Sequence, residues 1–245
     1  MEDAISALSN LFGIPRDPFK ATIGQCQIKW GHPSVPPEDQ VLRYLGYEDV
    51  DDLPGPTAIR WFHATRAPAG TSFEEGLLPS VAALPKLWRS LGAVAVNAGW
   101  TTAVGWMEYQ REFETSDRRY ALQFRPKGMS PEFGGPFAFL VRDAALGQHD
   151  VHKDFTRIPP ESLEDISRDF EEKYEHPLLK AYQAATKPCI VIFTRPGDWY
   201  GAVRAALNFV HRSVLGLEQT LDCNTSFNGT GHVVPASWID HVEWL

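Results

Sequence analysis

The chain has 245 residues, of which 43% are hydrophobic and 12% aromatic, so it can bury a substantial core. Its formal net charge of −8 argues against a chain built throughout to hold phosphate backbones or anionic membranes. The scattered cysteines (Cys26, Cys189 and Cys223) predict neither a disulfide framework nor a metal site. No stretch approaches the roughly 20 apolar residues that span a bilayer. We therefore expect a soluble, cytoplasmic protein that has no membrane partner.

The first part of the chain predicts short helices. Residues 3–11 and 38–45 have helical patterns, and a stretch punctuated by proline and glycine separates them. We interpret residues 1–57 as a small helical extension that packs on a main domain, residues 58–245.

The main domain mixes strands and helices without regular alternation. "IRWFHATRA" alternates from Ile59 to Phe62 and predicts a strand with His63 near its end. Further strands are predicted in "AVAVN", "RYALQFRP", "PFAFLVRD" and "CIVIFTRP". Helices are predicted over residues 84–91 and in "TTAVGWMEYQREFE", "PPESLEDISRDFEEKYE", "LLKAYQAA" and "DWYGAVRAALNFVHRS". This order favours an α+β fold over a doubly wound sheet, and glycine-rich loops of the Rossmann or Walker type are absent.

The strand with His63 carries a resemblance to a known family. "FHATR", followed by "FEEGLLPS", resembles the first strand of the ADP-ribosyltransferase superfamily, in its histidine-type branch with diphtheria-toxin-like and poly-ADP-ribose-polymerase-like enzymes. The resemblance implies a split β-sheet core with flanking helices, and NAD as the substrate. It also implies that His63 binds a ribose of NAD, that the backbone at Ala64 grips the nicotinamide amide, that Thr65 stabilises the end of the strand, and that Arg66 binds NAD with them. A neutral imidazole offers one donor and one acceptor, which suits ribose hydroxyls.

A second feature of the family is an aromatic pair that sandwiches nicotinamide. "NAGWTTAVGWMEYQ" resembles the segment that carries it, which implies this role for Trp100 and Tyr109. Stacking on a cationic ring is worth about 1–2 kcal/mol when the rings are desolvated. Tyr120 has the family's spacing from Tyr109 but falls on a predicted strand, so we do not favour that pair. The alternative is that Trp100, Trp106 and Tyr109 belong to the core.

A third feature is a carboxylate near the C-terminus. In the family it stabilises the positive charge that develops as the glycosidic bond breaks. Many bacterial members have this glutamate just before a "VVP" segment, where this chain has His232. We therefore expect Glu243, in "DHVEW", to be the catalytic acid, and His232 is the competing occupant of the position. A protonated imidazole there would repel the developing cation.

These features predict an NAD-dependent ADP-ribosyltransferase that modifies a macromolecule, either a protein or a nucleic acid, in a toxin or defence role. One alternative is an RNA 2'-phosphotransferase-like enzyme, in which cations neutralise the phosphate of the substrate. The arginines near predicted strand ends that would serve it are Arg60, Arg66, Arg125 and Arg195. Another alternative is a catalytically weak module that binds NAD or ADP-ribose.

Overall fold

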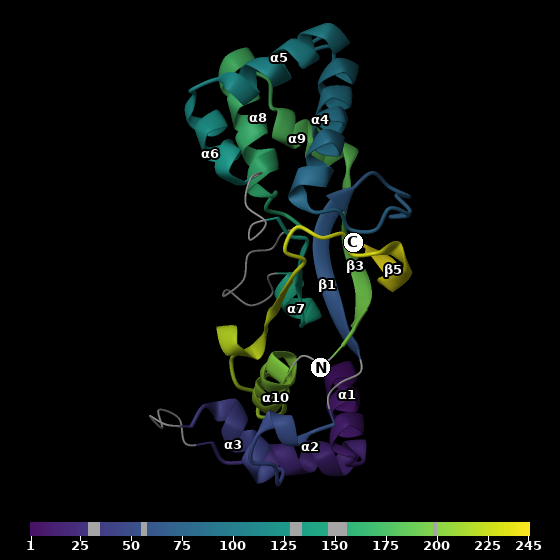
Figure 1. The fold of residues 1–245 in the computed structure, drawn as a ribbon, viewed down its shortest axis with the longest axis vertical. Helices are drawn as coiled ribbons and strands as arrows, with labels where there is room; N and C mark the ends of the chain where they lie inside the picture. Colours follow the sequence, from purple (N-terminus) through teal and green to yellow (C-terminus); the bar gives the residue numbers. More distant parts are fainter. Residues whose placement is uncertain (29–34, 55–57, 128–133, 147–155, 198–199) are drawn as a thin grey trace. The chain divides into compact units, whose positions relative to one another are not determined.

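The structure is a computed structural model that describes residues 1–28, 35–54, 58–127, 134–146, 156–197 and 200–245. It has a mixed α+β fold, with a five-stranded sheet and helices before and between its strands in the chain (Figure 1). The chain forms two compact units. Unit 1 comprises Met1–Phe62, Phe139–Lys153 and Phe193–Ser226, and unit 2 comprises His63–Ala138, Asp154–Ile192 and Phe227–Leu245. Each unit is therefore assembled from three separate stretches of sequence.

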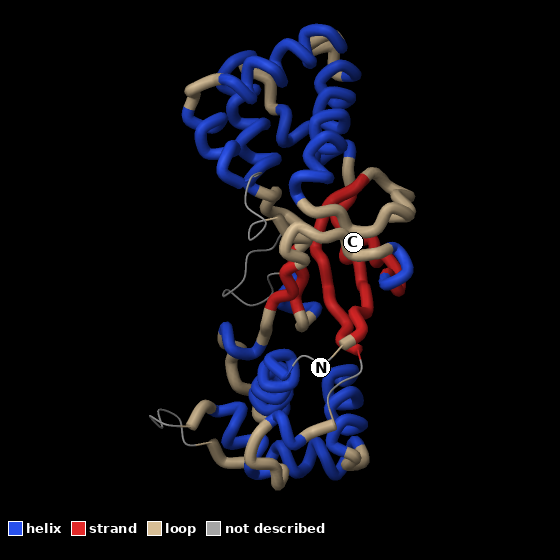
Figure 2. Tube along the Cα trace, in the orientation of Figure 1, coloured by secondary structure: helices blue, strands red, loops and turns tan. Residues whose placement is uncertain are grey.

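The sheet has the strand order β4-β2-β1-β3-β5. Its strands are drawn in red in Figure 2. Its strands are β1 (Ala58–Ala67), β2 (Phe137–Phe139), β3 (Lys187–Pro196), β4 (Ser226–Asn228) and β5 (Ile239–Trp244). β1 pairs with β2 in antiparallel orientation, with Phe62 opposite Phe139. The predicted strands at β1 and β3 are confirmed. β3 is buried continuously from Cys189 to Phe193, as expected for a strand covered on both faces.

Unit 1 is mainly helical. Its helices are α1 (Glu2–Phe12), α2 (Arg16–Gln25), α3 (Pro37–Tyr44), α7 (Arg142–Ala145) and α10 (Tyr200–Val214), with short 3-10 turns η1 (Val50–Asp52) and η3 (Leu221–Cys223). The predicted helices at α1, α3 and α10 are confirmed, whereas α2 was not predicted. Pro18 lies in the first turn of α2, where a helix needs no N–H group from that residue. The core joins Phe19 and Leu42 to Leu207 and Val210 of α10.

Unit 2 contains the second helical group. Its helices are α4 (Ser80–Asn97), α5 (Ala103–Thr115), α6 (Arg119–Lys127), α8 (Glu161–Tyr174) and α9 (Leu178–Ala185), with a short 3-10 turn η4 (Ala236–Trp238) near the C-terminus. As predicted, α5 begins after a threonine cap, because the Thr102 hydroxyl accepts from the Gly105 amide at 3.1 Å. The helices enclose an aromatic core that includes Trp88, Trp106 and Phe170.

Two predicted strands are helices, and a third is much shorter than expected. Residues 93–97 end α4, and residues 120–126 belong to α6. Ala121 and Phe124 are buried at helical spacing, so the apolar pattern of "RYALQFRP" serves one face of a helix. In "PFAFLVRD", only Phe137–Phe139 is a strand, and α7 follows it.

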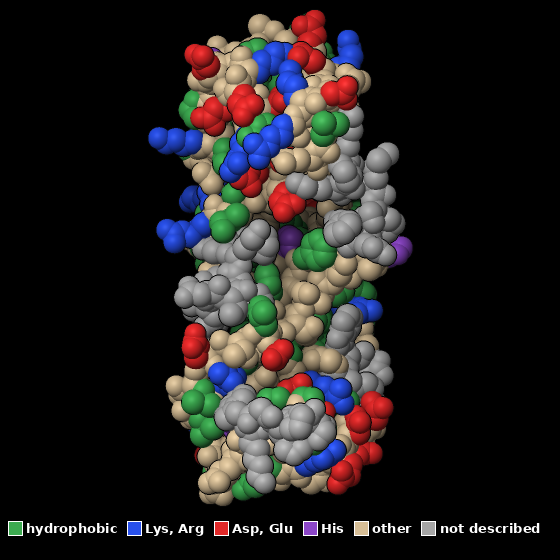
Figure 3. Space-filling model, turned by 90° about the vertical axis from the view of Figure 1, so that its left-hand side faces the viewer, with side chains coloured by type: hydrophobic (Ala, Val, Ile, Leu, Met, Phe, Trp, Pro, Cys, Tyr) green, Lys and Arg blue, Asp and Glu red, His purple; other side chains and the backbone are tan. Residues whose placement is uncertain are grey.

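The charged surface is mixed in sign. On the face drawn in Figure 3, Lys and Arg side chains lie among Asp and Glu side chains. The described residues of this face therefore form no continuous basic stripe of the kind typical of proteins that track a phosphate backbone. Among the described helices, none combines the length and the apolar character needed to cross a membrane.

Candidate functional site

His63 is held at a defined tautomer on β1. Its Nδ1 lies 2.6 Å from the carbonyl oxygen of Phe137, the first residue of β2. Because a carbonyl only accepts, Nδ1 carries the proton, and Nε2 of the neutral ring is an acceptor. Burial lowers the pKa of His63, and the bond to the Phe137 carbonyl partly opposes this. Within the described part of the chain, no hydrogen bond occupies Nε2.

Three segments singled out by the resemblance meet beside this histidine. The residues just before β2 contact the loop that leads to His232, because the Gly231 amide donates to the Gly135 carbonyl at 3.1 Å. Two residues after His232, Val234 pairs with Leu77 in an isolated antiparallel bridge. Unit 2 therefore brings His63, "FEEGLLPS" and "GHVVP" together at the start of β2.

This convergence depends on a glycine. Gly76 has a φ of +78°, and a Cβ at this position would lie 2.0 Å from the carbonyl oxygen of Val234. That distance is far below van der Waals contact, so no larger side chain fits without moving the backbone. The Gly-Leu dipeptide of "FEEGLLPS" thus allows the close approach of the two segments.

Arg66 has a structural role instead of the expected role in binding NAD. Its Nη2 donates to the carbonyls of Gln183 and Thr186 at 2.8 and 3.0 Å, which closes the C-terminus of α9. Its Nη1 donates to the Thr156 carbonyl at 2.8 Å, and its Nε to the Thr186 hydroxyl at 3.3 Å. Four of its five N–H donors are therefore used within the protein. The neighbouring Ala64 and Thr65 are half-buried on β1.

The expected aromatic pair does not form a sandwich. Tyr109 is 1% exposed in the aromatic core, and its hydroxyl donates to the Ile166 carbonyl at 2.9 Å. Trp100 stacks on His176, with ring centroids 5.0 Å apart and 10° between the planes. The expected role of Tyr109 is therefore wrong, because the helical spacing that suggested it places the ring in the core, and Trp100 already has a ring partner.

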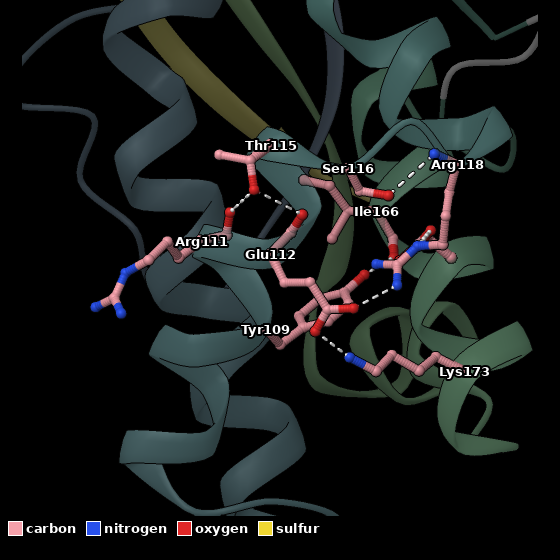
Figure 4. Close-up of polar contacts among 9 residues, drawn as sticks. Tyr109, Arg111, Glu112, Thr115, Ser116, Arg118, Ile166 and Lys173 are labelled. Atoms are coloured by element: carbon pink, nitrogen blue, oxygen red, sulfur yellow. Dashed lines mark hydrogen bonds and ion pairs between the residues drawn. The ribbon is translucent and has the colours of Figure 1, made fainter.

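A network of charges joins α5 to α8 next to Tyr109 (Figure 4). Arg118 donates from Nε and Nη2 to both carboxylate oxygens of the buried Asp169, at 2.8 Å each. Figure 4 shows Arg118 and Lys173 converging on Glu112, with Nη1 of Arg118 2.7 Å from Oε1 and Lys173 bonded to Oε2. These hydrogen bonds lower the pKa of Glu112. Since the carboxylates and the cations of this network are paired with one another, we interpret the network as a structural link between α5 and α8.

The two candidates for the catalytic position lie in different places. Glu243 is half-buried on β5, and β3 separates that strand from β1 in the sheet. Its neighbours Val242 and Trp244 are half-buried too, so burial does not alternate along this end of β5. His232 is exposed in the loop that is hydrogen-bonded to the segment before β2. Hydrogen bonds connect the segment of His232 to the residues just before β2, whose first carbonyl is the partner of His63.

The other candidate arginines come from different elements. Arg60 is exposed on β1, Arg195 is half-buried on β3, and the side chain of Arg125 lies outside the described structure. The described residues contain no group of three or more His, Cys, Asp or Glu side chains arranged to hold a metal ion. The sequence did not reveal the Phe137 carbonyl as the partner of His63, because it lies 74 residues further along the chain.

The sequence matches no protein-family model, and comparisons with curated proteins and with solved structures give no significant match.

Proposed function

We propose that this chain is an NAD-dependent ADP-ribosyltransferase whose sheet is the split sheet of that superfamily. The observation that carries the proposal is the hydrogen bond from His63 to the Phe137 carbonyl. It fixes a neutral imidazole with an acceptor at Nε2, which suits the hydroxyl of a ribose. The reaction would break the bond between nicotinamide and ribose and transfer ADP-ribose to a protein or nucleic acid.

The backbone and side chains near His63 support binding of a dinucleotide. The Ala64 backbone continues the strand beyond the histidine, where N–H and C=O groups match a carboxamide. Phe137, whose carbonyl holds His63, also has a side chain that is 46% exposed. This ring is therefore a better candidate than the buried Tyr109 for stacking on a flat ligand ring.

The charge that stabilises the transition state would come from Glu243 or from a group near His232. If Glu243 supplies it, Glu243→Gln lowers NAD turnover about 100-fold, the order expected when one preorganised electrostatic group is lost. If turnover is unchanged in Glu243→Gln and lost in His232→Ala, the role belongs to His232.

A second candidate function is a catalytically weak module that binds NAD or ADP-ribose. The structural roles of Tyr109 and Arg66 favour it, because they remove two residues that the transferase reading had placed at the ligand. This module would bind NAD without releasing nicotinamide.

Calorimetric titration with NAD tests the role of His63. His63→Asn keeps an N–H donor near the position of Nδ1 and removes the acceptor at Nε2, whereas His63→Ala removes both. We expect each variant to weaken binding about fivefold or more, since a buried hydrogen bond contributes roughly 1 kcal/mol. Tyr109→Phe, which removes a core hydroxyl in the same unit, is the control and should keep the affinity of the unmodified protein. Equal affinity in all four proteins would refute the proposed site.

Incubation with labelled NAD and cell extract separates the two functions. Label in protein or nucleic acid supports the transferase and identifies the class of acceptor. NAD binding without label transfer or nicotinamide release supports the binding module.

A further inference from the structure

A cluster of charged side chains links α3, η1 and α10 in unit 1. Nε of Arg204, on α10, lies 3.3 Å from Oδ1 of Asp39, on α3. Nη2 of Arg204 donates to Oδ1 of Asp49, the residue that caps η1, also at 3.3 Å. Two carboxylates are therefore already paired with this one guanidinium. These residues take no part in the proposed NAD site.

Glu38 of α3 belongs to the same cluster and has a buried oxygen atom without a partner. Among the described residues, none forms a hydrogen bond with Oε2 of Glu38. The carboxylates of Asp39 and of Asp222, which lies on η3, repel a negative charge on Glu38. Arg204 attracts that charge, but its guanidinium is shared with the two carboxylates that it already contacts. An ionised Glu38 is therefore poorly compensated.

The surroundings of Glu38 favour its neutral form. Burial raises the pKa of Glu38 above its ordinary value of 4.5. A hydrogen bond from its own backbone N–H opposes this in part, and repulsion from Asp39 and Asp222 raises the pKa further. A protonated carboxyl group costs less to bury than an ionised one, and it is not repelled by its neighbours.

The helix that carries Glu38 forms part of the core of unit 1. Val41 and Leu42, on the same helix, are fully buried. They share one apolar cluster with Leu207 of α10 and Cys223 of η3. The charge of Glu38 therefore acts on the packing of α3 against α10 and η3.

We propose that Glu38 is a pH-sensitive switch of unit 1, which holds α3 against α10 and η3 when it is protonated and loosens α3 when it is ionised. The folded state keeps this proton to a higher pH than the unfolded chain does. The contribution of Glu38 to stability is therefore fully present below about pH 4.5 and is lost as the pH rises through the folded-state pKa.

The protonation of Glu38 can be followed by NMR in protein labelled with ¹³C at the glutamate carboxyl carbons. The signal of Glu38 is assigned by its loss in Glu38→Gln, and we expect its titration midpoint to lie above 4.5. Asp222→Asn removes one repelling charge and should lower this midpoint. Asp3→Asn, the same change at an exposed position on α1, should leave it unchanged. A midpoint at or below 4.5, or one that Asp222→Asn does not lower, would overturn the proposal.

Urea titrations and hydrogen exchange test the effect on α3. Glu38→Gln has nearly the shape of the protonated side chain and carries no charge, so its urea midpoint should exceed that of the unmodified protein at pH 7 and equal it at pH 3. At pH 7 the amides of α3 should exchange faster in the unmodified protein than in Glu38→Gln, whereas those of α8, in unit 2, should exchange equally fast in both. A urea midpoint that Glu38→Gln does not raise at pH 7, or equal exchange in α3, would contradict the switch.

Discussion

Gly76 sets how closely two segments approach at the candidate site. Its φ of +78° already disfavours other residues, and a Cβ would lie 2.0 Å from the Val234 carbonyl oxygen. Gly70 has a similar φ of +82° with nothing within 4 Å, so Gly70→Ala measures the backbone effect alone. We expect Gly70→Ala to lower the free energy of unfolding by about 1 kcal/mol and Gly76→Ala by at least about 3 kcal/mol, measured in urea. Equal losses of unfolding free energy in the two variants would show that the structure relieves the close contact with Val234 at no cost in stability.

The sequence indicates which residues have suitable chemistry and does not show what they contact. The alternation around His63 predicts its strand, but its Phe137 partner lies 74 residues away and depends on strand pairing. Tyr109 has a spacing that suits both a ligand face and a core face of a helix. Its burial is decided by α8, whose Ile166 carbonyl lies 57 residues away. Local sequence patterns do not indicate contacts between residues that lie so far apart in the chain.

The network between α5 and α8 makes the stability of these helices depend on pH. Hydrogen bonds from Lys173 and Arg118 hold the pKa of Glu112 below its ordinary value of 4.5. Since the lowered pKa belongs to the folded state, the stabilisation is fully present above about pH 4.5 and is lost as the pH falls through the folded value. The Glu112 side chain is 49% exposed, so solvent limits its contribution to about 1 kcal/mol or less.

Urea titrations of Glu112→Gln from pH 7 to pH 3 test this dependence. The variant should be less stable than the unmodified protein at pH 7, and the difference should vanish at the acidic end. Glu108→Gln, an exposed change on the same helix, should change stability by less than about 0.5 kcal/mol at either pH. If Glu112→Gln is still less stable than the unmodified protein at pH 3, the loss of stability does not come from the charge of Glu112.

Long elements are predicted better than short ones. α8 and α9 follow from extended patterns, with prolines ahead of them that suit helix starts. The five residues "AVAVN" form a short apolar run that suits a strand, yet they form the last turns of α4, where Ala95 is buried against the aromatic core. A pattern of five residues fits the period of a helix as well as that of a strand, and contacts with neighbouring helices determine which of the two forms.

Residues 1–57 are needed for the core of unit 1. Ile5, Phe19 and Leu42 from this segment share one apolar cluster with Leu207 and Val210 of α10. A chain that begins at residue 58 should expose that face of α10, and we expect it to bind the dye ANS strongly and to aggregate. The control is the full chain cut at an inserted protease site within residues 55–57, in which the released fragment should stay bound. A chain from residue 58 with the ANS fluorescence of the intact protein would contradict the prediction.

The division of unit 1 among distant stretches has a consequence for synthesis on the ribosome. The apolar faces of α1, α2 and α3 emerge early, but α10, which completes their core, ends at Val214. Protein synthesis adds roughly 5–20 residues per second, so about 8 to 35 seconds pass between the synthesis of α3 and that of the end of α10. During that interval the nascent chain carries an uncovered apolar surface, which makes it a natural client for chaperones that act at the ribosome exit.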